Sequence, residues 1–133
     1  MTSPILRFTV PGTPVPKQRA RRGKGGRHYT PAKTRGYETT VLVYAYQAIA
    51  REGRWPWPND QPCAVTVRVF WPDKRRRDLD NTVKAITDAM NRNVYRDDSQ
   101  IIELRAFKTM ADPNPRAEVE VRMVDASKAR TGT

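Results

Sequence analysis

The chain has 133 residues, with 25 lysines and arginines against 14 aspartates and glutamates, a formal net charge of +11 and a pI near 10.4. This length is that of one domain with a single modest core, and this charge favours a polyanionic partner such as nucleic acid. No apolar run approaches the roughly 20 residues that span a bilayer, and one cysteine with one histidine excludes a disulfide framework and a zinc centre built on nitrogen and sulfur ligands.

The N-terminal part is predicted to be a strand followed by a long basic loop. Apolar residues alternate over 5–10, and the pair Pro11-Gly12 marks the end of this strand. The segment 11–35 then holds four prolines, four glycines and eight lysines or arginines, but no acid. Because no periodic pattern survives this composition, we expect a long loop, and loops of this length in compact domains are usually functional or disordered.

A helix and a strand are predicted next. Apolar and small residues recur at spacings of three and four across 36–51, which predicts a helix that stops at Gly53. The connector that follows carries Trp55 and Trp57, which we expect to hold it against the core. Alternation with β-branched residues then predicts a strand over 63–71.

The last part is predicted to contain a helix from Asp80 and two strands. One apolar stripe on this helix is formed by Leu79, Val83, Ile86 and Met90. The strands over 101–110 and 116–124 are separated by the turn "ADPNP", which predicts a hairpin. The order β-α-β-α-β-β indicates an α/β (α+β) fold, in which two helices pack on a mixed sheet. We expect one domain over 1–125 and a flexible polar tail over 126–133.

Acidic residues interrupt the basic sequence at two places. Asp78 and Asp80 follow four consecutive cations, and Lys84 lies one helical turn after Asp80 on the same face. Asp97 and Asp98 precede the next strand, where a sheet edge commonly meets a helix start, so one of them would complete a cluster. Any metal in this chain must be bound by oxygen, which favours Mg²⁺ or Mn²⁺. Such an ion activates water and relieves charge during phosphodiester hydrolysis, and a nearby lysine adds positive charge.

The residues alone leave a second interpretation open. Asp78 and Asp80 are also common as helix caps, the Asp97-Asp98 pair is also typical of a turn, and Asp88 is expected on the helix surface or in a hydrogen bond. The chain would then be a non-catalytic, basic nucleic-acid-binding protein. That hypothesis explains the charge, but it does not explain why acids interrupt a surface that binds phosphates.

The segments around these aspartates resemble the RusA family of Holliday junction resolvases. The similarity consists of "RRRDLDN" at 75–81, Lys84, "TDAM" at 87–90 and "RDDSQI" at 96–101. The N-terminal "VPGTPVPKQRAR" and "YTP" resemble the branch found in bacteriophages and prophages. The resemblance covers most of residues 5 to 124.

This resemblance implies a structure-specific endodeoxyribonuclease that resolves four-way DNA junctions in recombination and repair. It implies Mg²⁺, with Mn²⁺ able to substitute, bound by Asp78, Asp80 and Asp98, with Asp97 as the alternate third ligand. It further implies that Lys84 assists cleavage and that the enzyme is a homodimer. The protein is expected in the cytoplasm, encoded by a bacterium or a bacteriophage, and away from membranes.

Two basic segments are predicted to contact DNA phosphates, one in the 11–35 loop and one directly before Asp78. The predicted contacts are Lys17, Arg19, Arg21, Arg22, Lys24, Arg27, Lys74, Arg75, Arg76 and Arg77.

Overall fold

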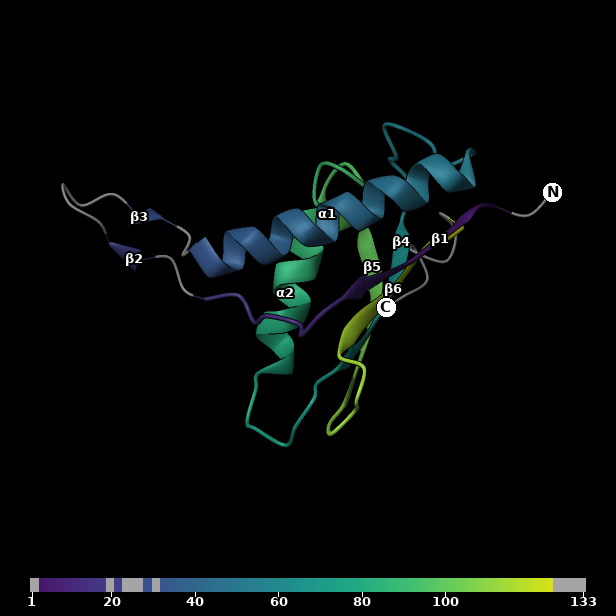
Figure 1. The fold of residues 1–133 in the computed structure, drawn as a ribbon. Coiled ribbons are helices and arrows are strands. Elements are labelled where there is room, and N and C mark those ends of the chain that lie inside the picture. Colours follow the sequence, from purple (N-terminus) through teal and green to yellow (C-terminus); the bar gives the residue numbers. More distant parts are fainter. Residues whose placement is uncertain (1–2, 19–20, 23–27, 30–31, 126–133) are drawn as a thin grey trace.

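Two helices pack on one face of a four-stranded mixed sheet, which confirms the α+β prediction (Figure 1). This computed structural model describes residues 3–18, 21–22, 28–29 and 32–125, so the predicted tail 126–133 lies outside the described residues. The helices are α1 (Ala32–Glu52) and α2 (Leu79–Met90). The sheet consists of β1 (Ile5–Pro11), β4 (Cys63–Phe70), β5 (Ile101–Thr109) and β6 (Arg116–Met123). A separate short pair is formed by β2 (Arg21–Arg22) and β3 (His28–Tyr29).

The strand order is β1-β6-β4-β5, with β4 and β5 parallel and the other pairs antiparallel. The predicted hairpin between 101–110 and 116–124 is therefore wrong, because β4 lies between β5 and β6. The physical reason is the burial of β4, whose inward side chains from Cys63 to Val69 are fully buried. A strand with so apolar a face is best placed inside the sheet. The "ADPNP" segment therefore crosses the end of β4 to connect β5 with β6.

Helix α1 begins earlier than its pattern predicted, at Ala32 instead of Gly36. Thr34 explains the difference, because its buried hydroxyl accepts a hydrogen bond from the Gln18 backbone at 3.1 Å and fixes the first turn to the preceding chain. Gly53 ends the helix as predicted, with a left-handed φ of 76° that suits glycine. Neither helix among the described residues is both long and apolar enough to cross a membrane.

Two of the three tryptophans attach loops to the core, and the third does not. Trp71 is fully buried and its indole N–H donates to the Pro14 carbonyl at 3.0 Å. Trp55 is also buried and donates to the Val94 carbonyl at 2.8 Å, which confirms its predicted role. Trp57 is 58% exposed, so the prediction that it pins the connector is wrong.

The β4–α2–β5 unit determines where the acidic residues lie. Because β4 and β5 are parallel, α2 returns antiparallel to both strands, as a crossover connection must. The first turn of α2 is therefore at the carboxyl ends of the two strands, and the turn after α2 is at their amino ends. Figure 1 shows the loop before α2 at the lower end of the molecule and the other end of α2 behind α1.

Candidate active site

Asp78 is the N-cap of α2. Its backbone is extended, with φ −93° and ψ 109°, and its carboxylate accepts hydrogen bonds from the Asn81 backbone at 3.3 Å and the Asn81 side chain at 2.8 Å. The capping interpretation of Asp78 is therefore confirmed as one of its roles. Both Asp78 and Asp80 are nevertheless exposed to solvent, and a carboxylate has more acceptor sites than a cap uses.

Lys84 lies one turn after Asp80, and its side chain is 60% exposed. Its ammonium is 3.6 Å from Asp88, which also accepts a 2.6 Å hydrogen bond from Lys17. Asp88 is thus a hydrogen-bonding residue, as expected. The arrangement leaves the Lys84 ammonium accessible to a ligand near the start of α2.

Lys17 connects the segment after β1 to both helices, α1 and α2. Its backbone N–H donates to the Asn81 carbonyl at 2.8 Å, and its ammonium bonds Asp88 at 2.6 Å and Glu38 of α1 at 3.1 Å. Burial acts to lower the pKa of Lys17, but the hydrogen bonds to the two carboxylates outweigh it and leave the pKa raised. The basic segment after β1 is therefore attached to the first turn of α2, beside Asp80.

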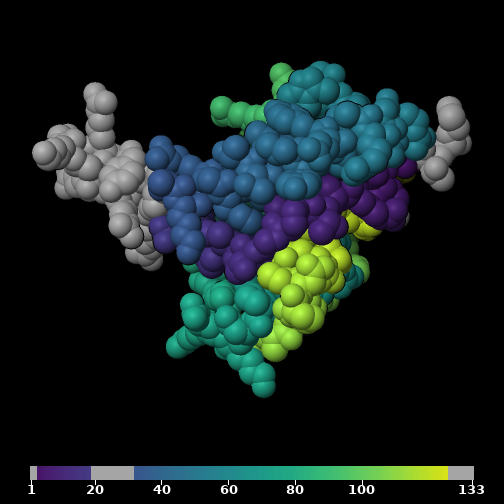
Figure 2. All heavy atoms as spheres, in the orientation of Figure 1, coloured from purple at the N-terminus to yellow at the C-terminus, as the bar shows by residue number. Residues whose placement is uncertain are grey.

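The loop 71–78 brings exposed cations to the same end of the molecule, at the lower end of Figure 2. Asp73 organises this loop, because it accepts from the Arg75 backbone at 2.9 Å and the Arg77 guanidinium at 2.6 Å. The hydrogen bond from Arg77 holds the pKa of Asp73 below its usual value. Arg77 turns inward over Trp71, whereas Lys74, Arg75 and Arg76 are exposed. The loop therefore presents three cations to solvent beside the start of α2.

Asp97 and Asp98 lie at the opposite end of α2, in the 3₁₀ turn Asp98–Gln100 and its cap. Asp97 accepts a hydrogen bond from the Ser99 backbone at 2.9 Å, while its own N–H donates to the Gln100 side chain at 2.7 Å. The hydrogen bonding to Ser99 lowers the pKa of Asp97, with a smaller contribution from the charge of Arg92. Asp98 is exposed, and its side chain forms no hydrogen bond or ion pair with a described residue, so its carboxylate is the freer of the two.

The expectation that the three aspartates meet within one chain is wrong. Among residues 3–18, 21–22, 28–29 and 32–125, no three acidic, histidine or cysteine side chains are grouped to hold a metal. The reason is the direction of α2: Asp78 and Asp80 lie at its start, Asp98 lies beyond its end, and a helix of 12 residues is about 18 Å long. A single chain therefore has the carboxylates of Asp78 and Asp80 at the start of α2 and those of Asp97 and Asp98 beyond its end.

Several predicted DNA contacts lie where their side chains are not described. Arg19, Lys24 and Arg27 fall outside the described residues, and the side chains of Arg21 and Arg22 in β2 are likewise not described. Contact between any of these residues and phosphate therefore stays a prediction.

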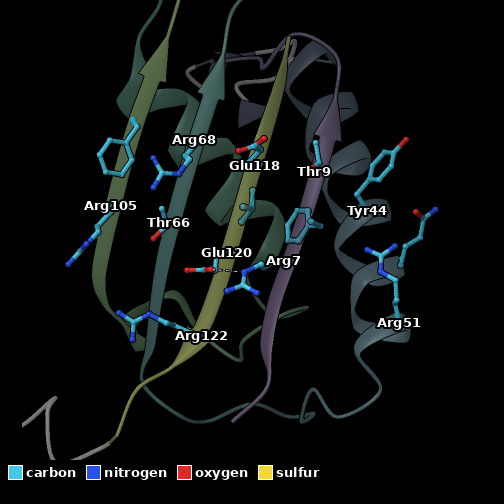
Figure 3. A pocket seen from close by; sticks show the side chains of 14 residues that line it. Arg7, Thr9, Tyr44, Arg51, Thr66, Arg68, Arg105, Glu118, Glu120 and Arg122 are labelled. Carbon is cyan, nitrogen blue, oxygen red and sulfur yellow. Dashed lines mark hydrogen bonds and ion pairs between the residues drawn. The ribbon is translucent and has the colours of Figure 1, made fainter. Parts of the chain in front are cut away.

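A hollow of about 720 Å³ lies over the outward side chains of the sheet and is closed on one side by Tyr44, Gln47 and Arg51 of α1, as Figure 3 shows. Arginines from each of the four strands line it, and two glutamates of β6 lie between them. Arg7 bonds Glu120 at 2.8 Å, and Arg68 lies over the Phe107 ring at 4.4 Å. Strand alternation in the sequence would have found these outward residues, which the sequence analysis missed. None of the candidate catalytic residues lines this hollow.

Comparison with known proteins adds an independent observation. A family model described as "Endodeoxyribonuclease RusA" matches residues 11–122. The chain is 28% identical over 115 residues to the crossover junction endodeoxyribonuclease RusA of Escherichia coli strain K12, covering 86% of this chain and 91% of that protein. It is 29% identical over 145 residues to the uncharacterized protein YqaN of Bacillus subtilis strain 168, covering 91% and 98%. A 61-residue stretch is 34% identical to the crossover junction endodeoxyribonuclease of Enterobacteria phage 82, covering 45% and 51%.

Proposed function

Because the chain belongs to the RusA family of endodeoxyribonucleases, we propose that it resolves four-way DNA junctions by paired, Mg²⁺-dependent hydrolysis of phosphodiester bonds, in recombination and repair. The observation that carries this proposal is the first turn of α2. There two exposed carboxylates, Asp78 and Asp80, adjoin the exposed cations of the preceding loop. We place the enzyme in the cytoplasm of a bacterium, encoded by the host or by a phage.

The donor set suits a hard divalent cation, because aspartate oxygens are the ligands that Mg²⁺ prefers and Mn²⁺ also accepts. When bound, the ion supplies an activated water and offsets charge on the phosphoryl oxygens. Asn81 fixes the orientation of the Asp78 carboxylate through two hydrogen bonds. Lys84, exposed one turn away, supplies a fixed positive charge for the phosphate that is cleaved.

The separation of the aspartates within one chain supports a two-fold homodimer. If two chains associate so that α2 of one runs antiparallel to α2 of the other, Asp98 of each chain approaches Asp78 and Asp80 of its partner. Strand β5 offers a surface for this contact, since it is at the sheet edge and Ile102 and Leu104 are 44% and 51% exposed. One dimer would then hold two complete acidic sites, which matches the two incisions that a junction requires.

The exposed cations at this end are proposed to bind the phosphate backbone that the aspartates alone would repel. Each phosphate contact on duplex DNA adds roughly 0.9 to the slope of log affinity against log salt. Replacing Arg75 and Arg76 together by alanine should therefore reduce that slope by up to about two units. An unchanged slope would place the DNA elsewhere on the protein.

The test is cleavage of a labelled four-way junction, with and without Mg²⁺, beside a linear duplex of the same sequence. Wild-type protein should cut the junction only with the metal, and Asp80→Asn should bind it as tightly or more tightly without cutting it. Asp60→Asn is the matched control, because Asp60 is also an exposed aspartate whose partner, Arg96, is exposed. Junction binding without cleavage by the wild type, under all metals tried, would favour the non-catalytic binding protein.

A further inference from the structure

A second hollow, of about 270 Å³, lies between α1 and the turn that follows α2. Aromatic and aliphatic side chains line most of it, and two polar residues of the turn complete it. The lining residues are Tyr46, Ile49, Trp55, Trp57, Arg92 and Asn93. Two of its aromatic side chains are open to solvent: Trp57 is 58% exposed and Tyr46 is 49% exposed.

The walls of this hollow are held in place by hydrogen bonds. The Tyr46 hydroxyl donates to the Asn93 side chain at 2.6 Å, and the Asn93 amide donates in turn to the Ala89 and Asn91 carbonyls, each at 3.1 Å. The Trp55 indole is fixed by its bond to Val94. Because Tyr46 and Trp55 are fixed before any ligand arrives, a flat ligand that enters loses little free energy to ordering these two rings.

The rim of the hollow is basic and lies near Asp97, the alternate third ligand. Arg92 is exposed, has a left-handed φ of 66°, and forms no ion pair with a described residue. Its charge nevertheless reaches Asp97, where it contributes to lowering the pKa of that carboxyl. The hollow therefore combines exposed aromatic faces with a cation that lies near Asp97.

We propose that this hollow binds one unstacked nucleobase of branched DNA, stacked on Trp57, with the adjoining phosphate at Arg92. This inference rests on the proposed function for its DNA substrate. Bases stack on exposed aromatic side chains whatever their sequence, and a branch point supplies bases that are already partly unstacked. A second copy of the chain is the competing occupant, but an apolar protein surface would bury Arg92 without supplying an acid.

The test compares Trp57→Ala and Trp57→Phe with the wild type in EDTA, which prevents metal-dependent cleavage. Binding is measured to a four-way junction and to a linear duplex of the same sequence. Trp57→Ala should weaken junction binding about ten-fold, the scale of one lost base stack, and leave duplex binding unchanged. Trp57→Phe should stay within a few-fold of the wild type. Phe107→Ala is the matched control, because Phe107 is an aromatic residue 44% exposed outside this hollow.

Fluorescence gives a second, direct readout. Trp55 and Trp71 are buried, so junction DNA should quench the emission of Trp57 and this quenching should vanish in Trp57→Phe. Equal weakening of junction and duplex binding, or no weakening, would overturn the proposal. A Trp57→Ala protein that sediments as a smaller species would overturn it in favour of a chain–chain contact. Failure of the wild type to bind any junction would instead refute the proposed function.

Discussion

Asp80→Asn and Asp98→Asn should each abolish cleavage alone, yet a heterodimer of the two variants should regain one active site. The expectation follows from the crossover helix, which is about 18 Å long and has Asp80 in its first turn and Asp98 beyond its far end, so that these carboxylates can meet only across a dimer. In the heterodimer, one shared site combines both substitutions and the other combines both native aspartates.

The size of the effect follows from this arrangement. Random pairing of equal amounts makes about half of the dimers mixed, so roughly a quarter of all sites are intact. Co-expression with two different affinity tags isolates the mixed dimer, in which half of the sites are intact. On a labelled junction this species should nick one strand and accumulate nicked junctions, because its second site is inactive.

The reverse pairing provides the decisive control. A heterodimer of wild type with the double variant Asp80→Asn/Asp98→Asn should be inactive, since each shared site then contains one substitution. If each site instead lay within one chain, this heterodimer would nick one strand and the heterodimer of single variants would be inactive. That pair of results would refute the shared site, and the same experiment with Asp97→Asn tests the alternate ligand.

Three other substitutions or measurements test particular contacts. Asp78→Ala should lower the free energy of unfolding by about 1 kcal/mol in urea, whereas Asp78→Asn should keep the cap and its stability but lose cleavage; equal stability of Asp78→Ala and wild type would contradict this. Lys17→Met should cost about 1–3 kcal/mol at pH 7 by leaving Asp88 without its 2.6 Å donor. Because the pKa of Lys17 is raised above 10.5, this contribution is present below that pH and should shrink as the pH rises further; a difference that persists at high pH would argue against the ion pairs. Burial raises the pKa of Cys63 to about 11, so a thiol reagent at pH 8 should label it only when the protein unfolds, and rapid labelling of folded protein would show that the start of β4 opens locally.

The helices and the four main strands could be predicted from the sequence, because each has a clear hydrophobic period. The stripe from Leu79 to Met90 is buried as expected, and β4 alternates as expected. The order of the strands was not predictable in the same way. The "ADPNP" turn favours a hairpin locally, whereas the buried inward face of β4, from Cys63 to Val69, favours a place for β4 between β5 and β6.

The candidate site was predictable in composition but not in geometry. Residue types and the resemblance indicated Asp78, Asp80, Lys84 and Asp98, whereas their separation depends on the direction of a crossover helix between parallel strands. If β4 and β5 had been predicted to be parallel, the separation of these residues would have followed. The predicted hairpin between β5 and β6 instead left the direction of α2 open. Trp57 was missed because two neighbouring tryptophans look alike in sequence, although only Trp55 has a backbone acceptor within reach.

The pairing of β1 with β6 has a consequence for the nascent chain. In the described sheet β1 precedes the other strands in the chain but hydrogen-bonds to β6, which follows them all, and Arg7 and Glu120, which bond across this pair, are 113 residues apart. β4 likewise has no partner in the main sheet until β5 has emerged, and its second partner, β6, comes later still. Contacts between such distant residues form slowly, because a long loop must close before they contribute. During synthesis the early strands therefore remain unpaired and prone to aggregation, and the main sheet can be completed only when nearly the whole domain has left the ribosome.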